Sequence, residues 1–428
     1  MPPKFFFDIL KTMKNDVPQE KDWDHKKLGR ELDLFTFSDV VGKGLPLWTP
    51  KGAAIRREIE RFIVDEEIKR GYSHVYTPDI AKLELYKKSG HYPYYKESMY
   101  APIKIEDEEF MLRPMTCPHH FELFLDKPRS YRELPIRYAE LAKLYRFEKS
   151  GELMGLQRVR SFCLADAHII CKKSQAGVEI NSVLDLIDYF AKILGLKKDE
   201  DYNYRLSLGD RADEKKYFKD DKSWDYAEDI LRQALKKRKS KFVEAPGEAA
   251  FYGPKIDIQM VNANGKEDTA FTVQYDFVMS KRFKLEYINE EGKMEEAVVV
   301  HRSSVGAIER VIAFLIEKSK GNFPTWLTPV QVKVLPITEK HLEYANRVVE
   351  ELQKANIRVE LDDRNERLQA KIRDAQLEKV AYMFIVGDKE ADAGTVSVRK
   401  RNGDDLGSKD LGDFLKALRK EIEEKIIN

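Results

Sequence analysis

Charged and aromatic residues gather around two glycines between Leu144 and Cys171, a stretch that predicts two β-strands joined by a loop. Alternate side chains of a strand point to the same face, so Arg146 and Glu148 should share a face of the first strand. The second strand should present a further set on one face: Arg158, Arg160 and Phe162. Guanidinium groups beside an aromatic ring could bind a polyphosphate attached to a flat base. A solvated hairpin with ordinary cross-strand ion pairs explains the same spacing equally well.

Three further residues could together bind a metal ion, although they lie far apart in the sequence: Cys117, His168 and His301. A thiolate and two imidazoles suit Zn²⁺ and leave one coordination position open for a substrate. The chain has no compact signature such as CxxC or HExxH, so unrelated buried polar residues would account for the three as well.

The elements that must position these residues are a series of strands and amphipathic helices. Apolar residues from Lys51 to Tyr72 recur at helical spacing, and the helix should run into a strand that meets Pro78. A β-branched run carries His301, and Gly306 should open a helix that bears Arg310. After Pro324, strand and helix patterns alternate, which indicates a small α/β domain on a mixed or parallel sheet.

Length, composition and cysteine content bound the possibilities further. A chain of 428 residues suggests two or three domains, and a formal net charge of +1 requires any nucleic-acid surface to arise from local clustering of basic residues. Three cysteines do not make a disulfide framework. No run of about 18 apolar residues occurs, so we expect no membrane span and a cytoplasmic protein.

Three segments together resemble the motifs of class II aminoacyl-tRNA synthetases, and most closely those of threonyl-tRNA synthetases. They are residues 144–168 with their arginines and the Asp-Ala-His ending, RPMTCPHH at 113–120, and VVVHRSSVGAIER at 298–310. The helix–strand unit at 51–80 resembles the motif that forms the dimer interface of the class. The resemblance covers about residues 24–428. It implies an α/β (α+β) fold, in which helices flank an antiparallel class II sheet and a C-terminal α/β anticodon-binding domain follows.

The expected domains are an N-terminal arm at 1–23, a catalytic domain at 24–326 and an anticodon-binding domain at 327–428. Threonyl-tRNA synthetases usually carry a large editing region before the catalytic domain, and residues 1–23 leave no room for one. We therefore expect editing by a separate protein in trans, tolerance of some serine errors, or a truncated chain.

The resemblance implies that the chain activates L-threonine with ATP and Mg²⁺ and transfers it to the 3′ end of tRNA(Thr) as a homodimer. The implied catalytic residues are His91, Arg146, Lys255 and Arg310. The implied ATP-binding residues are Arg146, Glu148, Arg158, Phe162, Gln274 and Arg310. Threonine should contact Arg146, Asp166 and Tyr252. One Zn²⁺ per subunit should bind Cys117, His168 and His301. The anticodon should be read by Asn365, Arg373, Lys379, Glu390 and Arg399.

Such a zinc ion would explain a selection that shape cannot make. An apolar pocket discriminates between the near-isosteric valine and threonine by only about a hundredfold. A zinc ion coordinated by the β-hydroxyl would leave valine, which has no hydroxyl, under-coordinated. Serine has the hydroxyl and lacks only a methyl group, so serine errors are expected.

Four positions depart from the commonest pattern of the family: Leu164, Ala165, Thr269 and Ser303. Leu164 cannot hydrogen-bond a carboxylate or a phosphate, so substrate handling should differ in detail. The alternatives are a paralogue with altered amino-acid specificity, a regulatory RNA-binding protein that does not charge tRNA, and an enzyme that loads an amino acid onto a carrier protein.

Overall fold

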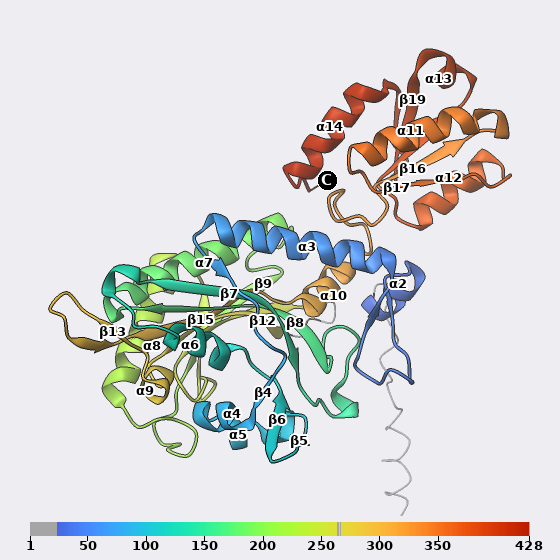
Figure 1. The fold of residues 1–428 in the computed structure, drawn as a ribbon. Helices are drawn as coiled ribbons and strands as arrows, with labels where there is room; N and C mark the ends of the chain where they lie inside the picture. The colour runs from blue at the N-terminus through green and yellow to red at the C-terminus, as the bar shows by residue number, and fades with distance from the viewer. Residues whose placement is uncertain (1–23, 263–264, 266, 428) are drawn as a thin grey trace, which may run out of the picture.

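The structure is a computed structural model that describes residues 24–262, 265 and 267–427; the arm expected at 1–23 lies outside the described residues. The described chain forms two lobes, each built around its own sheet (Figure 1). The larger lobe contains the three motif segments. The smaller lobe lies beyond the long helix α3 (Pro50–Lys69) and contains the alternating C-terminal elements.

An eight-stranded sheet with the order β10-β9-β11-β12-β15-β8-β7-β3 organises the larger lobe. The strands are β3 (Ser73–His74), β7 (Ile136–Tyr145), β8 (Ser161–Cys171), β9 (Tyr202–Leu208), β10 (Phe242–Pro246), β11 (Lys255–Val261), β12 (Glu267–Asp276) and β15 (Val298–Ala307). Neighbouring strands are antiparallel except at the two edges, where β10 runs parallel to β9 and β3 parallel to β7. The expected antiparallel class II sheet is thus confirmed.

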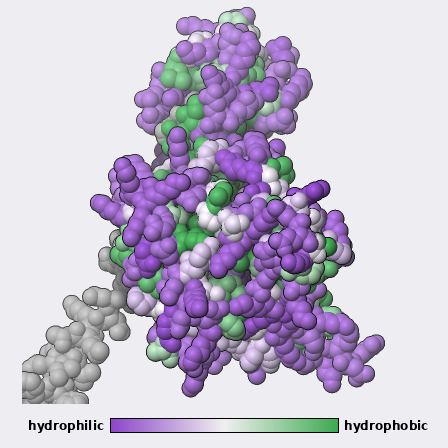
Figure 2. Space-filling model, turned by 90° about the vertical axis from the view of Figure 1, so that its left-hand side faces the viewer, coloured by the Kyte–Doolittle hydropathy of each residue, from purple (hydrophilic) through white to green (hydrophobic). Residues whose placement is uncertain are grey.

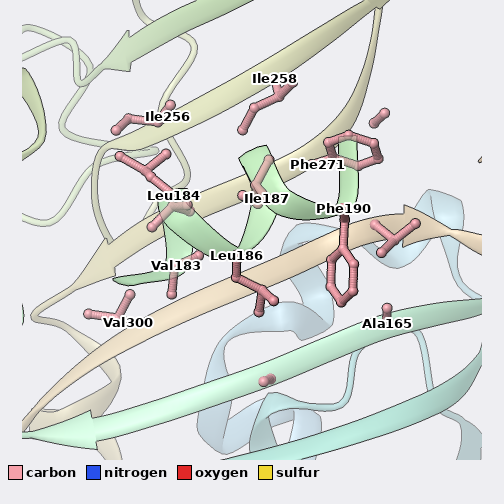
Figure 3. Packing of buried hydrophobic residues seen from close by; sticks show 14 of the residues in the cluster. Ala165, Val183, Leu184, Leu186, Ile187, Phe190, Ile256, Ile258, Phe271 and Val300 are labelled. Atoms are coloured by element: carbon pink, nitrogen blue, oxygen red, sulfur yellow. The ribbon is translucent and has the colours of Figure 1, made fainter. Parts of the chain in front are cut away.

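Helix α7 (Ala176–Ile193) covers one face of this sheet, because its apolar residues recur every three to four positions. Leu184, Ile187 and Phe190 point at the sheet, where Ile258 and Phe271 meet them (Figure 3). Since strand side chains alternate, the residues between these apolar positions point to the other face. That opposite face carries the candidate site. The remaining main helices of the lobe are α2 (His25–Glu31), α3, α8 (Asp221–Lys237) and α10 (Ile308–Ser319).

Shorter elements complete the larger lobe. The short strands are β1 (Phe35–Thr36), β2 (Leu47–Trp48), β4 (Ile80–Lys82), β5 (Ile103–Ile105), β6 (Glu108–Leu112), β13 (Glu286–Ile288) and β14 (Met294–Glu296). The short helices are α4 (Leu83–Ser89), α5 (His91–Tyr94), α6 (Cys117–Leu125) and α9 (Met279–Phe283). The 3₁₀ turns are η1 (Lys96–Ser98), η2 (Tyr131–Glu133), η3 (Ser150–Glu152), η4 (Lys173–Gln175) and, in the smaller lobe, η5 (Glu339–His341).

The smaller lobe contains a five-stranded mixed sheet with the order β17-β16-β18-β19-β20, as the alternating pattern predicted. Its strands are β16 (Val332–Pro336), β17 (Val359–Leu361), β18 (Tyr382–Val386), β19 (Thr395–Lys400) and β20 (Asp405–Asp410). Its helices are α11 (Leu342–Lys354), α12 (Leu368–Leu377), α13 (Asp388–Ala393) and α14 (Leu411–Glu423). Strands β17, β16 and β18 run parallel, and β19 and β20 continue antiparallel.

Arg358 joins the two lobes through four short polar contacts. Its guanidinium donates to the carbonyl of Trp326 at 2.7 Å and twice to that of Thr328, at 2.9 and 3.1 Å. The fourth contact is an ion pair with Glu58 of α3 at 3.1 Å. Burial lowers the pKa of Arg358 to about 10. The proline-containing segment between the lobes is therefore bonded on both sides.

Two details of the expected elements are wrong. The first predicted strand ends at Tyr145 and the second begins at Ser161, so Arg146, Glu148, Arg158 and Arg160 all lie in the connecting loop. The backbone makes one further ladder bond, from Arg146 N to Arg160 O at 3.0 Å, and then turns back on itself. Gly306 lies inside β15 with a φ of +76°, and the helix begins only at Ile308. A Cβ at Gly306 would lie 2.1 Å from the carbonyl oxygen of Ala270, so only glycine allows this approach.

Hydrophilic residues dominate the face shown in Figure 2, and hydrophobic residues show through near its middle and on the upper lobe. Among the residues that the structure describes, none of the helices combines the length and the apolar character that a membrane crossing needs.

Candidate active site

A cavity of about 470 Å³ lies between the loop after β7, the ends of β11 and β12, and helix α10. Four of the six predicted ATP-binding residues line it: Arg146, Glu148, Arg158 and Arg310. The guanidinium of Arg146 lies over the ring of Phe162, 5.2 Å from its centre, so this predicted ring borders the same group. The sixth residue, Gln274, lies further along the sheet.

Hydrogen bonds hold the cationic lining in place. Arg158 pairs with Glu148 at 2.8 Å. Arg310 donates to the carbonyl of Gln157 at 3.1 Å and also bonds the carbonyl of Thr269. Burial lowers the pKa of both Arg146 and Arg310. Buried cations that face one cavity are costly unless an anion joins them, so this lining suits a polyphosphate.

Arg160 does not share the face of Arg158. Its guanidinium lies over the ring of Phe147, 4.7 Å from the centre, and donates to the carbonyl of Glu148 at 2.9 Å. Strand alternation failed here because the residues belong to a loop whose direction the 3₁₀ turn η3 resets.

Cys117, His168 and His301 converge on the sheet face opposite α7. His168 and His301 are direct cross-strand partners on β8 and β15, with ring centres 4.7 Å apart. Cys117 is the first residue of α6. One ligand atom from each residue lies within 4.8 Å of the other two, and all three side chains are buried. The structure thus assembles the three predicted ligands into one cluster.

The chemistry of the cluster fits a zinc ion. Zn–S and Zn–N bonds at tetrahedral angles place their ligands roughly 3.3–3.7 Å apart, so small side-chain adjustments suffice. Burial lowers the pKa of His168 well below its ordinary value, which keeps the imidazole neutral as a ligand must be. Burial, with Asp166 and Asp276, raises the pKa of the Cys117 thiol, and a bound cation would reverse this effect.

The predicted threonine-contacting residues surround the cluster. The ring of Tyr252 stacks on His301 at 5.0 Å and 25°, and its hydroxyl donates to Gln274 Oε1 at 2.6 Å. An oxygen of Asp166 lies 4.0 Å from Nε2 of His168, and burial raises the pKa of this carboxyl. A buried carboxyl beside three possible metal ligands is a suitable hydrogen-bond partner for a small hydroxylated substrate.

His91 and Lys255 complete the predicted set. His91 is buried, with Nε2 3.9 Å from the sulfur of Cys117 and Nδ1 2.7 Å from the Ser89 hydroxyl. Burial, then His301 and Arg146, lowers its pKa to about 3. Lys255 forms an ion pair with the buried Asp257 at 2.8 Å.

The structure also shows the contacts of the four positions that depart from the commonest pattern of the family. The Ser303 hydroxyl donates to the carbonyl of Ala165 at 3.0 Å. Thr269 accepts a hydrogen bond from Gln259 at 2.7 Å. Leu164 pairs with Ala307 across the irregular end of β15.

The five predicted anticodon residues come from separate elements of the smaller lobe. Asn365 follows β17, and Arg373 on α12 is exposed. The Arg399 guanidinium on β19 pairs with Asp405 at 3.3 Å. The Glu390 carboxylate accepts from the backbone of Gly387 at 2.9 Å and so caps α13. The side chain of Lys379 lies close to Gly321, at the junction between the lobes.

Sequence reasoning missed several buried polar residues that hold the site together. Arg302 and Glu67 form an ion pair at 2.8 Å between β15 and α3. His25 accepts from the backbone of Leu156 at 3.2 Å and contacts Glu317 at 2.6 Å, which anchors the loop that lines the cavity. The doubled histidine after Cys117 was the one visible signal for another of them, His120.

Comparisons with known proteins identify the family of the chain. Residues 100–319 match the family described as tRNA synthetase class II core domain (G, H, P, S and T), and residues 331–421 match the anticodon binding domain family. The fold is that of a class II aminoacyl-tRNA synthetase core. The chain is 50% identical over 408 residues to a threonine–tRNA ligase of Halalkalibacterium halodurans and 47% identical over 424 residues to that of Staphylococcus carnosus.

The chain is also similar to a solved structure from Cryptosporidium parvum, titled the RNA binding domain of threonyl-tRNA synthetase. The match covers 93% of this chain and 98% of the other, at 36% identity and a TM-score of 0.87. It therefore belongs to the threonyl-tRNA synthetase family. The matches cover 95% and 98% of this chain, but the chain spans only 63% and 65% of the length of the Halalkalibacterium and Staphylococcus relatives.

Proposed function

We propose that the chain is a threonine–tRNA ligase, which activates L-threonine with ATP and transfers it to the 3′ end of tRNA(Thr). The observation that carries this proposal is the position of the Cys117, His168 and His301 cluster beside a cavity lined by Arg146 and Arg310. The side chain of Arg146 connects the two, since its guanidinium lies 3.3 Å from the sulfur of Met115, two residues before Cys117.

ATP would lie in the cavity with its base against Phe162 and Arg310, next to Glu148. Arg146 would hold the α-phosphate while the threonine carboxylate attacks it, and Arg158 or Arg310 would neutralise the outgoing pyrophosphate together with Mg²⁺. The protein's contribution would be positioning and charge stabilisation rather than covalent chemistry. The buried cationic lining supports this assignment.

Threonine would lie against the metal cluster. A zinc ion held by Cys117, His168 and His301 would supply one open position for the amino and β-hydroxyl groups. Asp166 would accept the hydroxyl's hydrogen bond, and Tyr252 would orient the amino group. Lys255 and Gln274 border the same face. His91 would assist proton transfer at the terminal ribose of the tRNA.

The remaining partners follow from the same proposal. Asn365, Arg373, Lys379, Glu390 and Arg399 would face the anticodon loop, with residues 24–326 as the catalytic and 327–428 as the anticodon-binding domain. A second copy would pack on the helix–strand unit of α3 and β3, where Tyr76 is 95% exposed. We place the enzyme in the cytoplasm.

Pyrophosphate exchange with ATP tests activation, and charging of bulk tRNA tests transfer. With threonine we expect both activities, with serine weak exchange, and with valine none. A Cys117→Ala variant should lose zinc and the preference for threonine over valine. Exchange without charging would indicate a carrier-loading enzyme, and the absence of both activities would contradict the proposal.

The matched control is Cys163→Ala. Cys163 is also buried, but strand alternation turns its side chain to the face of β8 opposite His168. Zinc content and threonine preference should remain unchanged in this variant. Full zinc content and selectivity in Cys117→Ala would refute the metal assignment.

A further inference from the structure

The two candidate histidine ligands each contact a different kind of side chain through one ring nitrogen. Nε2 of His301 lies 2.7 Å from Oδ2 of Asp276, and the other carboxylate oxygen, Oδ1, accepts from two backbone N–H groups. Nδ1 of His168 instead lies 2.8 Å from Nδ1 of another imidazole, that of His120 on α6. Two ring nitrogens at this distance share one proton, so the His120 ring decides which nitrogen of His168 carries it.

A carboxylate on the far side of His120 fixes the direction of this hydrogen bond. Nε2 of His120 lies 3.3 Å from Glu140 on β7. Although burial alone would raise the pKa of Glu140, hydrogen bonds and the Arg113 charge lower it to about 2, so the carboxylate only accepts. Arg113 at 3.0 Å and the Thr77 hydroxyl at 2.7 Å hold it.

These hydrogen bonds determine which ring nitrogens of His120 and His168 carry a proton. Because Glu140 accepts, Nε2 of His120 carries a proton. With this proton on Nε2, the His120 ring offers a lone pair on Nδ1. Nδ1 of His168 must therefore donate to it, which leaves Nε2 of His168 without a proton. Nε2 is the nitrogen that Asp166 approaches, on the side of the cluster.

We propose that His120 and Glu140 are positioning residues that lock His168 in the tautomer able to bind a metal ion through Nε2. This inference rests on the proposed metal centre and adds to it the residues that prepare one ligand. All members of the chain are buried, with exposed fractions of 2% for His168, 0% for His120 and 3% for Glu140. Water therefore does not compete for these hydrogen bonds.

The test is zinc binding by the metal-free full chain, titrated against a competing chelator. In His120→Leu the acceptor for His168 is lost, and zinc affinity should fall about 10- to 100-fold. In His120→Asn the amide oxygen takes the place of Nδ1, so affinity should stay within a few-fold of wild type. Rescue by asparagine separates a tautomer lock from a packing role. Co²⁺ absorption, which reports the coordination of the thiolate and imidazoles, should likewise be retained in His120→Asn.

The control is His119→Leu, at the neighbouring buried imidazole, whose ring lies against Tyr86. Its zinc affinity should equal that of wild type. Thermal unfolding checks that each variant is folded. Equal affinity in His120→Leu and wild type would overturn the inference, as would an equal loss in the asparagine and leucine variants. If the wild-type chain binds no zinc, the proposed metal centre falls together with the inference, which distinguishes that failure from the other two.

Discussion

Removal of either partner of the Glu67–Arg302 ion pair should destabilise the larger lobe strongly. The two side chains are 1% and 0% exposed, and the nitrogen–oxygen distance is 2.8 Å. Glu67 also accepts a hydrogen bond from Ser304 at 2.9 Å and lies 2.9 Å from His74. Burial alone would raise the pKa of Glu67, but Arg302 and His74 outweigh this effect and lower it. The pair therefore fixes β15, which carries His301, beneath α3.

The magnitude follows from what each variant leaves behind. Glu67→Leu leaves a buried guanidinium without a counter-charge, which costs about 3–5 kcal/mol. Arg302→Met should cost less, because His74 still faces the carboxylate. The double variant replaces both charges by apolar groups of similar size, so its cost should fall below the sum of the single costs by about 2 kcal/mol.

Urea unfolding of the wild type and the three variants, followed by near-ultraviolet circular dichroism, measures these free energies in one cycle. The control pair is Lys416 and Asp413, whose exposed ion pair at 2.9 Å should contribute almost nothing. A cost below about 1 kcal/mol for Glu67→Leu, or strict additivity in the cycle, would refute the reasoning.

Three further outcomes are expected. His25→Leu frees the backbone N–H of Leu156 and loosens the cavity loop, so the KM for ATP in pyrophosphate exchange should rise more than kcat falls; an unchanged KM would contradict the anchoring role. Gly306→Ala combines a φ of +76° with a clash at 2.1 Å and should lower the free energy of unfolding by about 1–3 kcal/mol, while Gly292→Ala, in open space, should cost less. The pKa of Glu140 is lowered from 4.5 to about 2, so its contribution to stability is complete above pH 4.5 and is lost as the pH falls toward 2. The free energy of unfolding of Glu140→Gln should therefore depend less on pH between 4.5 and 2 than that of the wild type. Equal pH dependence of the two proteins in this window would contradict the prediction.

The sequence was most informative where a motif names its residues. Cys117, His168 and His301 were predicted together from motif context, and the structure brings them together. Local pattern alone could not have done this, because the direct pairing of His168 with His301 depends on the register of two strands far apart in the chain. The α/β alternation of the smaller lobe was likewise readable, because hydrophobic period and turn residues are local signals.

Local pattern failed at the arginine loop and at the supporting residues. Alternation grouped Arg158 with Arg160, but the backbone leaves the ladder after one bond and sends Arg160 onto Phe147. The role of His120 depends on how α6 docks against β7 and β8. The doubled histidine after Cys117 is visible in the sequence, but it does not distinguish this contact from ordinary packing.

The bonds of Arg358 have a consequence for how the molecule would handle an elongated RNA. The carbonyls of Trp326 and Thr328 and the carboxylate of Glu58 clamp one guanidinium from both lobes, so the hinge has little freedom to swing. Small-angle scattering of the free chain should then match that of its RNA complex in interlobe separation. An RNA that contacts both lobes would therefore have to span a fixed distance, so the protein would select it by length as well as by its chemical contacts at either end.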